Sequence, residues 1–206
     1  MIAGIVLAAG RSRRYGRLNK LLDDWQGRPL LWWTLDAVCA SGLRPIVIVM
    51  GHDRAAIQNS LTRYRRRHRC RRSWRLRFNR DHRRGLSTSL RTGIAALPQE
   101  VRGAVVALGD MPAIDARLID ALRDAAMRTG TEAIDAVIPV HGQQRGNPVL
   151  LTRRLFEAVS SLRGDEGARR LLRRSRQVQE IDAPAGIGLD IDRRRDHRRQ
   201  ALGRFR

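Results

Sequence analysis

The sequence predicts an α/β fold with a mainly parallel central sheet. Four continuous apolar runs, rich in Val, Ile and Leu, have the length and composition of strands that are covered on both faces. Segments with helical periodicity separate these runs, and this alternation is typical of a doubly wound fold. We therefore expect one Rossmann-like, three-layer domain that spans residues 1–206.

The apolar runs place the strands at Ile2–Ala8, Pro45–Gly51, Gly103–Asp110 and Ala133–Val140. Helical patterns cover Pro29–Gly42, Asp53–Tyr64, Leu86–Leu97 and Asp115–Met127. We expect Gly42 to end the first helix and Ser87 to cap the third. The segment Trp74–Asn79 alternates apolar and polar residues, which predicts an edge strand.

The chain is extremely basic, with a net charge of +21 over 206 residues. Such a charge fits a polyanionic partner, or it reflects a proteome that places arginine on most surfaces. Of the 41 basic residues, Lys20 is the only lysine. Because either residue type can neutralise a phosphate, nearly exclusive use of arginine favours the compositional explanation for most of the charge.

Cysteine usage and the N-terminal segment bear on the compartment. Cys39 and Cys70 form neither a CxxC pair nor a zinc-ligand spacing, which favours a reducing environment such as the cytoplasm. The first apolar run is too short for a signal peptide or a bilayer span, so no membrane association is expected.

The segment Arg63–Arg84 contains twelve arginines together with Trp74 and Phe78. Basic residues interleaved with aromatic residues can bind single-stranded nucleic acid. The alternative is a solvated helix end followed by an edge strand, and we favour this second interpretation.

The segment Ala8–Lys20 leaves the first predicted strand as a glycine-bearing loop. It matches neither the P-loop spacing nor the dinucleotide GxGxxG pattern, but the backbone N–H groups of such a loop can hold phosphates. Lys20 stands out, since an ammonium is a compact charge on a flexible stem and an arginine is a planar fork. A site that needs a point charge on one phosphate oxygen would retain this lysine.

Open α/β sheets bind ligands at the carboxyl ends of their strands. This rule selects the loop Ala8–Gly16, the segment Gly51–Asp53 and the turn Gly109–Pro112. Asp110 ends a buried predicted strand, so its carboxylate is placed to meet a ligand or a metal.

The stretch Leu7–Leu22 resembles the LAAGxSxRMGxxKLL signature of the MobA-like nucleotidyltransferases, and most closely that of the molybdenum cofactor cytidylyltransferases. Five further segments resemble family motifs in the same order: Asn79–Leu97, Val106–Ile114, Gln143–Val159, Arg163–Leu172 and Gly188–Asp196. The chain departs from the family pattern at Tyr15, Asn147 and Arg193–Arg195, where the family has Met, His and a segment with Thr-Pro. The departure at Asn147 bears on the identity of the acceptor.

The resemblance implies transfer of a nucleotide from a nucleoside triphosphate to a phosphate on an acceptor, with release of pyrophosphate. It assigns catalytic roles to Lys20, Arg14 and Asp110, with Lys20 near the α-phosphate and Arg14 as a phosphate clamp. The nucleotide-binding residues that it implies are Leu7, Ala8, Ala9, Gly10, Arg11, Ser12, Arg14, Lys20, Asn79, Gly85, Ser87 and Ser89. Leu86 is expected beside Gly85, Ser87 and Ser89, and these four residues are expected to lie against the base and ribose.

The implied cofactor is Mg²⁺, which binds one or two carboxylates and completes its shell with phosphates and water. Asp110 is the first expected ligand, and Asp192 and Asp190 are the further ones. The alternatives are that Asp110 only forms a turn, and that Asp190 and Asp192 cap the last helix.

The resemblance favours CTP as the nucleotide and the phosphate of a molybdopterin-type cofactor as the acceptor, with Asn147 and Pro148 on the acceptor side. A molybdoenzyme that receives the cofactor is a further implied partner, and nucleic acid is not expected. Three alternatives stay open: another phosphorylated acceptor such as a sugar or alditol phosphate, a nucleic-acid-binding protein on a degenerate transferase fold, and a chaperone that hands over the cofactor.

Overall fold

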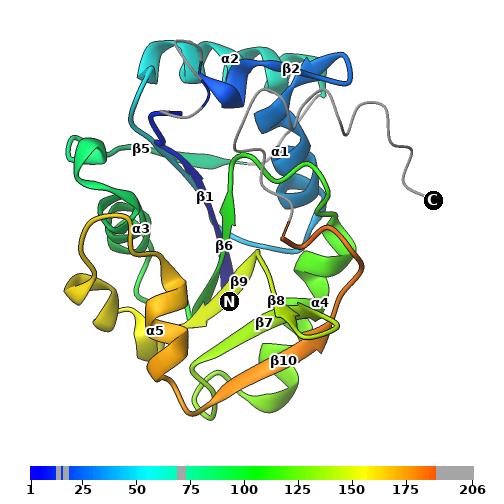
Figure 1. Cartoon of the computed structure of the whole chain (residues 1–206), viewed down its shortest axis with the longest axis vertical. Coiled ribbons are helices and arrows are strands. Elements are labelled where there is room, and N and C mark those ends of the chain that lie inside the picture. Colours follow the sequence, from blue (N-terminus) through cyan, green and yellow to red (C-terminus); the bar gives the residue numbers. More distant parts are fainter. Residues whose placement is uncertain (13–14, 16–18, 69–72, 189–206) are drawn as a thin grey trace.

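An eight-stranded sheet forms the middle layer of the computed structural model, which describes residues 1–12, 15, 19–68 and 73–188 (Figure 1). The strand order is β10 (Val178–Asp182), β7 (Ala136–His141), β9 (Val149–Thr152), β6 (Gly103–Leu108), β1 (Ile2–Ala8), β4 (Ile46–Met50) and β5 (Trp74–Phe78), and β8 (Gln144–Arg145) pairs with β7. Strands β8 and β9 run antiparallel to their neighbours, and the remaining pairs are parallel. The expected mainly parallel sheet is confirmed.

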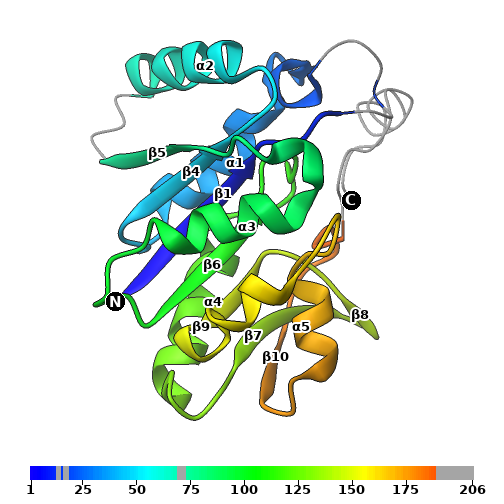
Figure 2. The same cartoon turned by 90° about the vertical axis from the view of Figure 1, so that its left-hand side faces the viewer.

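Helices cover both faces of this sheet (Figure 2). The helices are α1 (Leu30–Ala40), α2 (Arg54–Arg67), α3 (Leu86–Ala95), α4 (Ala116–Thr129) and α5 (Ala168–Arg174). Residues of α1, α2 and α4 share one buried cluster with Ile2 and Val6 of β1, while residues of α3 and α5 share a second cluster with Ala3 and Ile5. Successive side chains of a strand point to opposite faces, so β1 contributes to both clusters. The three-layer architecture is confirmed.

Shorter elements connect these helices and strands. They are η1 (Lys20–Leu22), β2 (Asp24–Trp25), β3 (Arg28–Pro29), η2 (His82–Arg84), η3 (Arg153–Leu155) and η4 (Ala158–Ser161). Among the described residues, none of the helices combines the length and hydropathy that a bilayer-spanning segment needs.

Two local expectations are wrong. Strand β6 ends at Leu108, so Asp110 lies in the following turn and does not end the strand. Ser87 does not cap α3, because the helix begins at Leu86 and its N-cap is Gly85. Gly85 has a φ of 105°, and a Cβ there would lie 2.2 Å from the Gly164 backbone, so another residue would be strained and would clash.

The predicted edge strand is confirmed as β5, which pairs with β4 at one end of the described sheet. Strands β9 and β10 were not predicted. Both depend on partners that are distant in sequence, since β9 inserts between β6 and β7 while β10 adds to the outer side of β7.

Replacing Gly93 by alanine is expected to destabilise the fold. At an exposed helical position this change stabilises by about 1 kcal/mol. Here the added Cβ would lie 2.7 Å from Cγ2 of Ile5, and overpacking of this kind costs about 1–3 kcal/mol. Urea unfolding of Gly93→Ala should therefore give a lower free energy of unfolding than the wild type.

The matched control is Ala95→Gly, at an exposed position of the same helix. It should lower the free energy of unfolding by about 0.5–1 kcal/mol, as helix propensity alone predicts. A Gly93→Ala protein more stable than the wild type would contradict the close contact between α3 and β1.

Candidate active site

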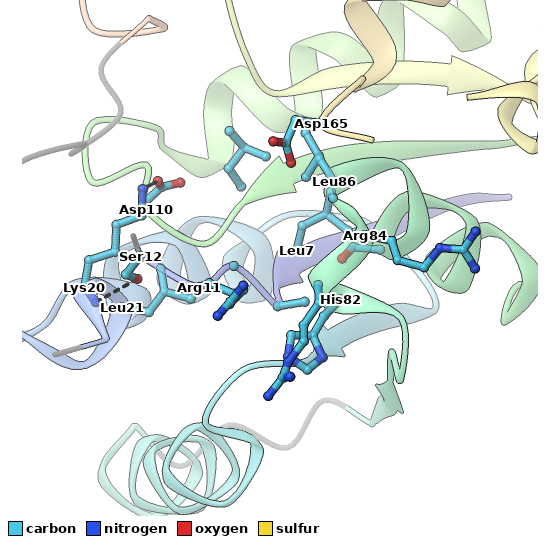
Figure 3. Close-up of a pocket in the computed structure, with 16 residues that line it drawn as sticks. Leu7, Arg11, Ser12, Lys20, Leu21, His82, Arg84, Leu86, Asp110 and Asp165 are labelled. Carbon is cyan, nitrogen blue, oxygen red and sulfur yellow. Dashed lines mark hydrogen bonds and ion pairs between the residues drawn. The ribbon is translucent and has the colours of Figure 1, made fainter. Parts of the chain in front are cut away.

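A cleft of about 600 Å³ opens at the carboxyl ends of β1 and β6 (Figure 3). Its walls come from the loop after β1, the segment η2–α3, the turn after β6 and the loop before α5. The lining residues are Leu7, Ala9, Gly10, Arg11, Ser12, Lys20, Leu21, His82, Arg83, Arg84, Gly85, Leu86, Ser89, Leu108, Asp110 and Asp165.

The parallel pairing of β1 with β6 brings the loop after β1 and the turn after β6 together. Leu7 pairs with Leu108 in the register of the two strands, and the N–H of Gly109 donates to the carbonyl of Leu7 at 3.0 Å. Parallel strands end at the same edge of a sheet, so Ala9 and Asp110 emerge side by side. This register brings together two segments that are about one hundred residues apart in the sequence.

Lys20 and Asp110 form an ion pair in the cleft. Their side chains are 16% and 9% exposed, so the pair is largely shielded from water. The short helix η1 positions Lys20, because the side chain of Asn19 accepts a hydrogen bond from the N–H of Leu21 at 3.1 Å. The hydroxyl of Ser12 accepts one from the N–H of Lys20 at 3.1 Å, which ties the glycine-bearing loop to this helix.

Thr34 of α1 forms hydrogen bonds with the turn that carries Asp110. This side chain is fully buried. Its hydroxyl lies 3.2 Å from the carbonyl oxygen of Leu108 and 3.3 Å from that of Met111, and it accepts a hydrogen bond from the N–H of Met111 at 3.2 Å. The position of the Asp110 carboxylate therefore depends on a contact with α1.

The opposite wall forms where the loop before α5 packs against the start of α3. The N–H of Ser87 donates to the carbonyl of Gly164 at 3.1 Å, next to the close approach at Gly85. Asp165 follows Gly164 and lines the cleft on the side away from Lys20 (Figure 3). The sequence analysis included Asp165 in a motif but did not select it as a site residue.

A basic group on the same wall was also missed, formed by His82, Arg83 and Arg84 of η2. These three residues directly precede the predicted site residue Gly85 in the sequence, and this adjacency was the signal that could have identified them. With Arg11 and Lys20 they give the cleft more cations than carboxylates. Such a site can bind a polyphosphate and offset charge that develops at phosphorus.

Most of the predicted site residues meet in this cleft. They are Leu7, Ala9, Gly10, Arg11, Ser12, Lys20, Gly85, Ser89 and Asp110. Ala8, Asn79 and Ser87 do not line it, and all three are buried. The side-chain amide of Asn79 donates to the hydroxyls of Thr88 and Ser89 at 2.8 and 3.0 Å, so Asn79 supports the wall from behind.

Some predicted residues lie elsewhere. Arg14, Asp190 and Asp192 fall outside the described residues, as does Cys70. Asn147 and Pro148 do not line the cleft. They immediately precede β9, whose Val149 pairs with Val106 of antiparallel β6, so they lie toward the same edge of the sheet as Asp110.

A divalent cation fits the donor set at Asp110. Carboxylate oxygens are the ligands that Mg²⁺ prefers, and this carboxylate is held in a cleft that can admit phosphates. Within residues that the structure describes, no group of three or more His, Cys, Asp or Glu side chains is arranged to hold a metal ion. A metal at Asp110 would therefore take its remaining ligands from phosphates, water or the predicted Asp190 and Asp192.

Replacing Thr34 by valine is expected to weaken nucleotide binding as well as stability. The change leaves the N–H of Met111 without its partner in a buried position, which costs about 1–3 kcal/mol. It also frees the turn that positions Asp110. Thermal unfolding should show a lower midpoint and a smaller upward shift when Mg²⁺ and CTP are added.

The control is Thr62→Val on α2, where the hydroxyl donates to the carbonyl of Gln58 in an exposed position. This variant should retain the full nucleotide-induced shift. An equal loss of that shift in both variants would contradict the role given to Thr34.

Comparison with curated proteins identifies relatives with several different names. The bifunctional protein GlmU of Clavibacter sepedonicus is 31% identical over 172 residues, which cover 81% of this chain and 30% of that protein. Nicotine blue oxidoreductase of Paenarthrobacter nicotinovorans is 28% identical over 93% of this chain and 92% of its own length. Purine catabolism protein PucB of Bacillus subtilis is 28% identical over 84% and 80%. The chain thus spans less than a third of the first of these relatives.

Solved structures share the fold over nearly the whole chain. Rv0371c of Mycobacterium tuberculosis superposes with a TM-score of 0.82 at 25% identity, over 98% of both chains. A second structure of that protein, a complex with manganese, gives 0.75 at 24% identity over 98% and 97%. Molybdopterin-guanine dinucleotide biosynthesis protein A of Archaeoglobus fulgidus gives 0.68 at 19% identity over 97% and 96%.

The decisive match is to a protein family. The family described as the MobA-like NTP transferase domain matches residues 4–180, which include each described segment of the cleft wall. The expected superfamily, that of the MobA-like nucleotidyltransferases, is confirmed. This chain belongs to the MobA-like NTP transferase domain family.

Proposed function

We propose that this protein transfers CMP from CTP to the phosphate of a molybdopterin-type cofactor, with release of pyrophosphate, in the cytoplasm. The observation that carries nucleotidyl transfer is the Lys20–Asp110 pair, set in a cleft that is lined by a glycine-bearing loop. The Lys20 ammonium suits a phosphate, and the Asp110 carboxylate suits a metal ion. Their contact puts both functions within reach of one phosphorus atom.

The triphosphate lies along the loop after β1 in this proposal. The backbone N–H groups of Ala9–Ser12 hold its outer phosphates, and Arg14 is the proposed clamp on them. Lys20 lies near the α-phosphate and offsets the charge that grows there as the acceptor oxygen attacks. The attacking and leaving groups are both anionic, so the cationic wall at Arg83 and Arg84 favours their approach.

Mg²⁺ is the proposed cofactor, with Asp110 as its first ligand and Asp190 and Asp192 as further ligands. When bound, the ion would neutralise phosphate charge and orient the triphosphate. The manganese complex of the Mycobacterium tuberculosis neighbour supports a divalent cation in a protein of this fold.

The preference for CTP rests on sequence features at two ends of the chain. The family resemblance links Leu7-Ala8-Ala9-Gly10 and the Asp-x-Asp pattern at Asp190 to cytidylyl transfer. Gly85, Leu86 and Ser89 line the cleft where the base and ribose would lie. Ser87 and Asn79 act from behind this wall.

A molybdopterin-type acceptor is supported by the motif pattern and by the fold shared with the molybdopterin-guanine dinucleotide biosynthesis protein A of Archaeoglobus fulgidus. Asn147 and Pro148 are the proposed acceptor-side residues, at the same sheet edge as Asp110. A molybdoenzyme would receive the product. A sugar or alditol phosphate acceptor is the alternative that an acceptor screen would detect.

Nucleic acid is not the proposed partner. Two aromatic residues of the basic segment already contact arginines of this chain, Trp74 with Arg65 and Phe78 with Arg54. These rings are therefore partly covered by the chain's own cations, which leaves less ring surface for stacked bases.

The direct test is pyrophosphate release with CTP, GTP or ATP, in the presence of Mg²⁺ and molybdenum cofactor. We expect turnover with CTP that exceeds turnover with the other two nucleotides. Equal turnover with GTP would refute the cytidylyl preference, and no turnover with any nucleotide would refute the proposed reaction.

Replacing Lys20 by arginine should separate binding from catalysis. The guanidinium keeps the charge but cannot place a point charge on the same phosphate oxygen. We expect the variant to fold and to keep its thermal shift with Mg²⁺ and CTP, while kcat falls by about two to three orders of magnitude. The control is Arg128→Lys at the end of α4, where kcat should not change. Near-normal kcat for Lys20→Arg would contradict the proposed role.

A further inference from the structure

Positive charge is concentrated in one stretch of the chain, residues 54–80. This stretch contains eleven arginines and neither Asp nor Glu, whereas residues 85–188 contain fourteen arginines and twelve Asp or Glu residues. A compositional preference for arginine explains why the cations are arginines, but it does not explain why one stretch lacks carboxylates. The imbalance within the chain therefore indicates a local cause for this part of the charge.

The structure places this charge on helix α2 and on the edge strand β5, which lie side by side (Figure 2). The rings of Tyr64 and Trp74 connect the two elements, with centroids 5.7 Å apart. Every described arginine of the stretch is exposed, and none of them lines the active-site cleft. We call these arginines the basic edge. They are Arg54, Arg63, Arg65, Arg66, Arg67, Arg75, Arg77 and Arg80.

The arginines of the basic edge have no carboxylate within ion-pair distance in the part of the chain that the structure describes. Elsewhere in the chain such partners are present, as in the pair of Arg123 with Asp120 at 2.8 Å. Clustered like charges repel one another, and Arg63 and Arg67 stand four residues apart on α2, where side chains are neighbours. The dipole of α2 favours the cations in its last turn, but it gives no such benefit to those of β5. An anionic partner would offset the repulsion.

Strand β5 offers backbone groups in addition to charge. It pairs with β4 on one side, and no strand of the described sheet pairs with its other side. Trp74 and Leu76 pack in the core cluster that includes residues of α2, so Arg75 and Arg77 project from the opposite face of the strand. Their spacing matches that of alternate side chains on a neighbouring extended chain.

We propose that the basic edge binds an acidic, extended segment of a partner protein, which adds to β5 as a further strand. Main-chain hydrogen bonds along the side of β5 away from β4 give affinity, and the side chains of the segment give specificity. Carboxylates at alternate positions lie opposite Arg75 and Arg77, whose planar guanidinium groups can bind them in a bidentate manner. The arginines of α2 attract the acidic segment over a longer range.

Two observations favour a peptide over a nucleic acid at this surface. The guanidinium of Arg65 lies 5.8 Å from the ring centroid of Trp74. That of Arg54 lies 4.9 Å from the ring centroid of Phe78, so both rings offer less surface for stacked bases. The edge of a strand also presents backbone donors and acceptors in a pattern that an extended peptide matches and a sugar-phosphate backbone does not.

Fluorescence anisotropy with a labelled peptide of about ten residues that alternates Thr and Glu tests the proposal at physiological salt concentration. The variant carries Arg75→Gln and Arg77→Gln. The matched control carries Arg117→Gln and Arg128→Gln, at exposed positions of α4, and has the same net charge as the variant. We expect saturable binding to the wild type and to the control, and a Kd raised about tenfold in the variant.

A second peptide separates strand addition from general charge attraction. It alternates Pro and Glu, so it keeps the charge of the first peptide but lacks every second backbone N–H group. We expect it to bind about tenfold more weakly than the Thr–Glu peptide. An excess of CTP with Mg²⁺ should not displace the Thr–Glu peptide, because the basic edge does not line the cleft.

Four results would overturn the proposal: no saturable binding to the wild type, equal Kd values for the two double variants, equal affinity for the two peptides, or displacement by CTP. Tighter binding of an oligothymidylate of matched charge, lost when Arg75 and Arg77 are replaced, would assign the surface to nucleic acid instead. Arg63→Gln with Arg67→Gln on α2 is the second variant, and it should raise the Kd about threefold. Each of these variants should retain the thermal midpoint of the wild type, because the arginines replaced are exposed.

Discussion

The parallel pairing of β1 with both β4 and β6 is the constraint on which the site depends. It places three carboxyl ends along one edge, with Ala8 beside Met50 and Leu7 beside Leu108. The glycine-bearing loop and Asp110 are about one hundred residues apart, and neither segment holds a ligand by itself. A shift in this register would move the carboxylate away from Lys20, and the cleft would lose its central ion pair.

Two contacts between distant segments turn this edge into a cleft. Thr34 on α1 holds the turn around Asp110, and the Gly85–Gly164 approach brings the loop before α5 over the start of α3. Both contacts end on backbone atoms, since the Thr34 hydroxyl bonds the backbone of Leu108 and Met111, and Gly85 lies against the backbone of Gly164. They fix the walls with little dependence on the many exposed arginines, which agrees with the compositional explanation of the charge. Lys20 lines the cleft and pairs there with Asp110.

The fold was predictable because each of its central strands can be recognised from a local run of apolar residues. Ile2–Ala8 matches β1 fully, and the alternation at Trp74 predicted the edge strand β5. The motif residues Lys20, Gly85 and Asp110 were selected from sequence, and they meet in one cleft. Ser87 was predicted to cap α3 from residue type alone, but the Gly85 contact with Gly164 determines where that helix begins.

The other features of the site could not be predicted from the sequence, because they depend on tertiary contacts. Asn79 was predicted to bind the nucleotide, but it is buried and its side-chain amide donates to the hydroxyls of Thr88 and Ser89. It therefore supports the cleft wall and does not line the cleft. The place of Asp165 in the cleft, and a separate cavity lined by Trp33 and Ala185, depend on segments that only the folded chain brings together. No local pattern in the sequence records that Trp33 and Ala185 face the same cavity.

The central claim is that a metal–triphosphate complex binds between the loop after β1 and Asp110. A crystal structure with Mn²⁺ and a non-hydrolysable CTP analogue, using the anomalous signal of manganese, tests it most directly. The account predicts manganese within coordination distance of an Asp110 carboxylate oxygen, phosphates along the N–H groups of Ala9–Ser12, and the Nζ of Lys20 on a phosphate oxygen. Manganese at another site, or a triphosphate that contacts neither the loop nor Lys20, would contradict it.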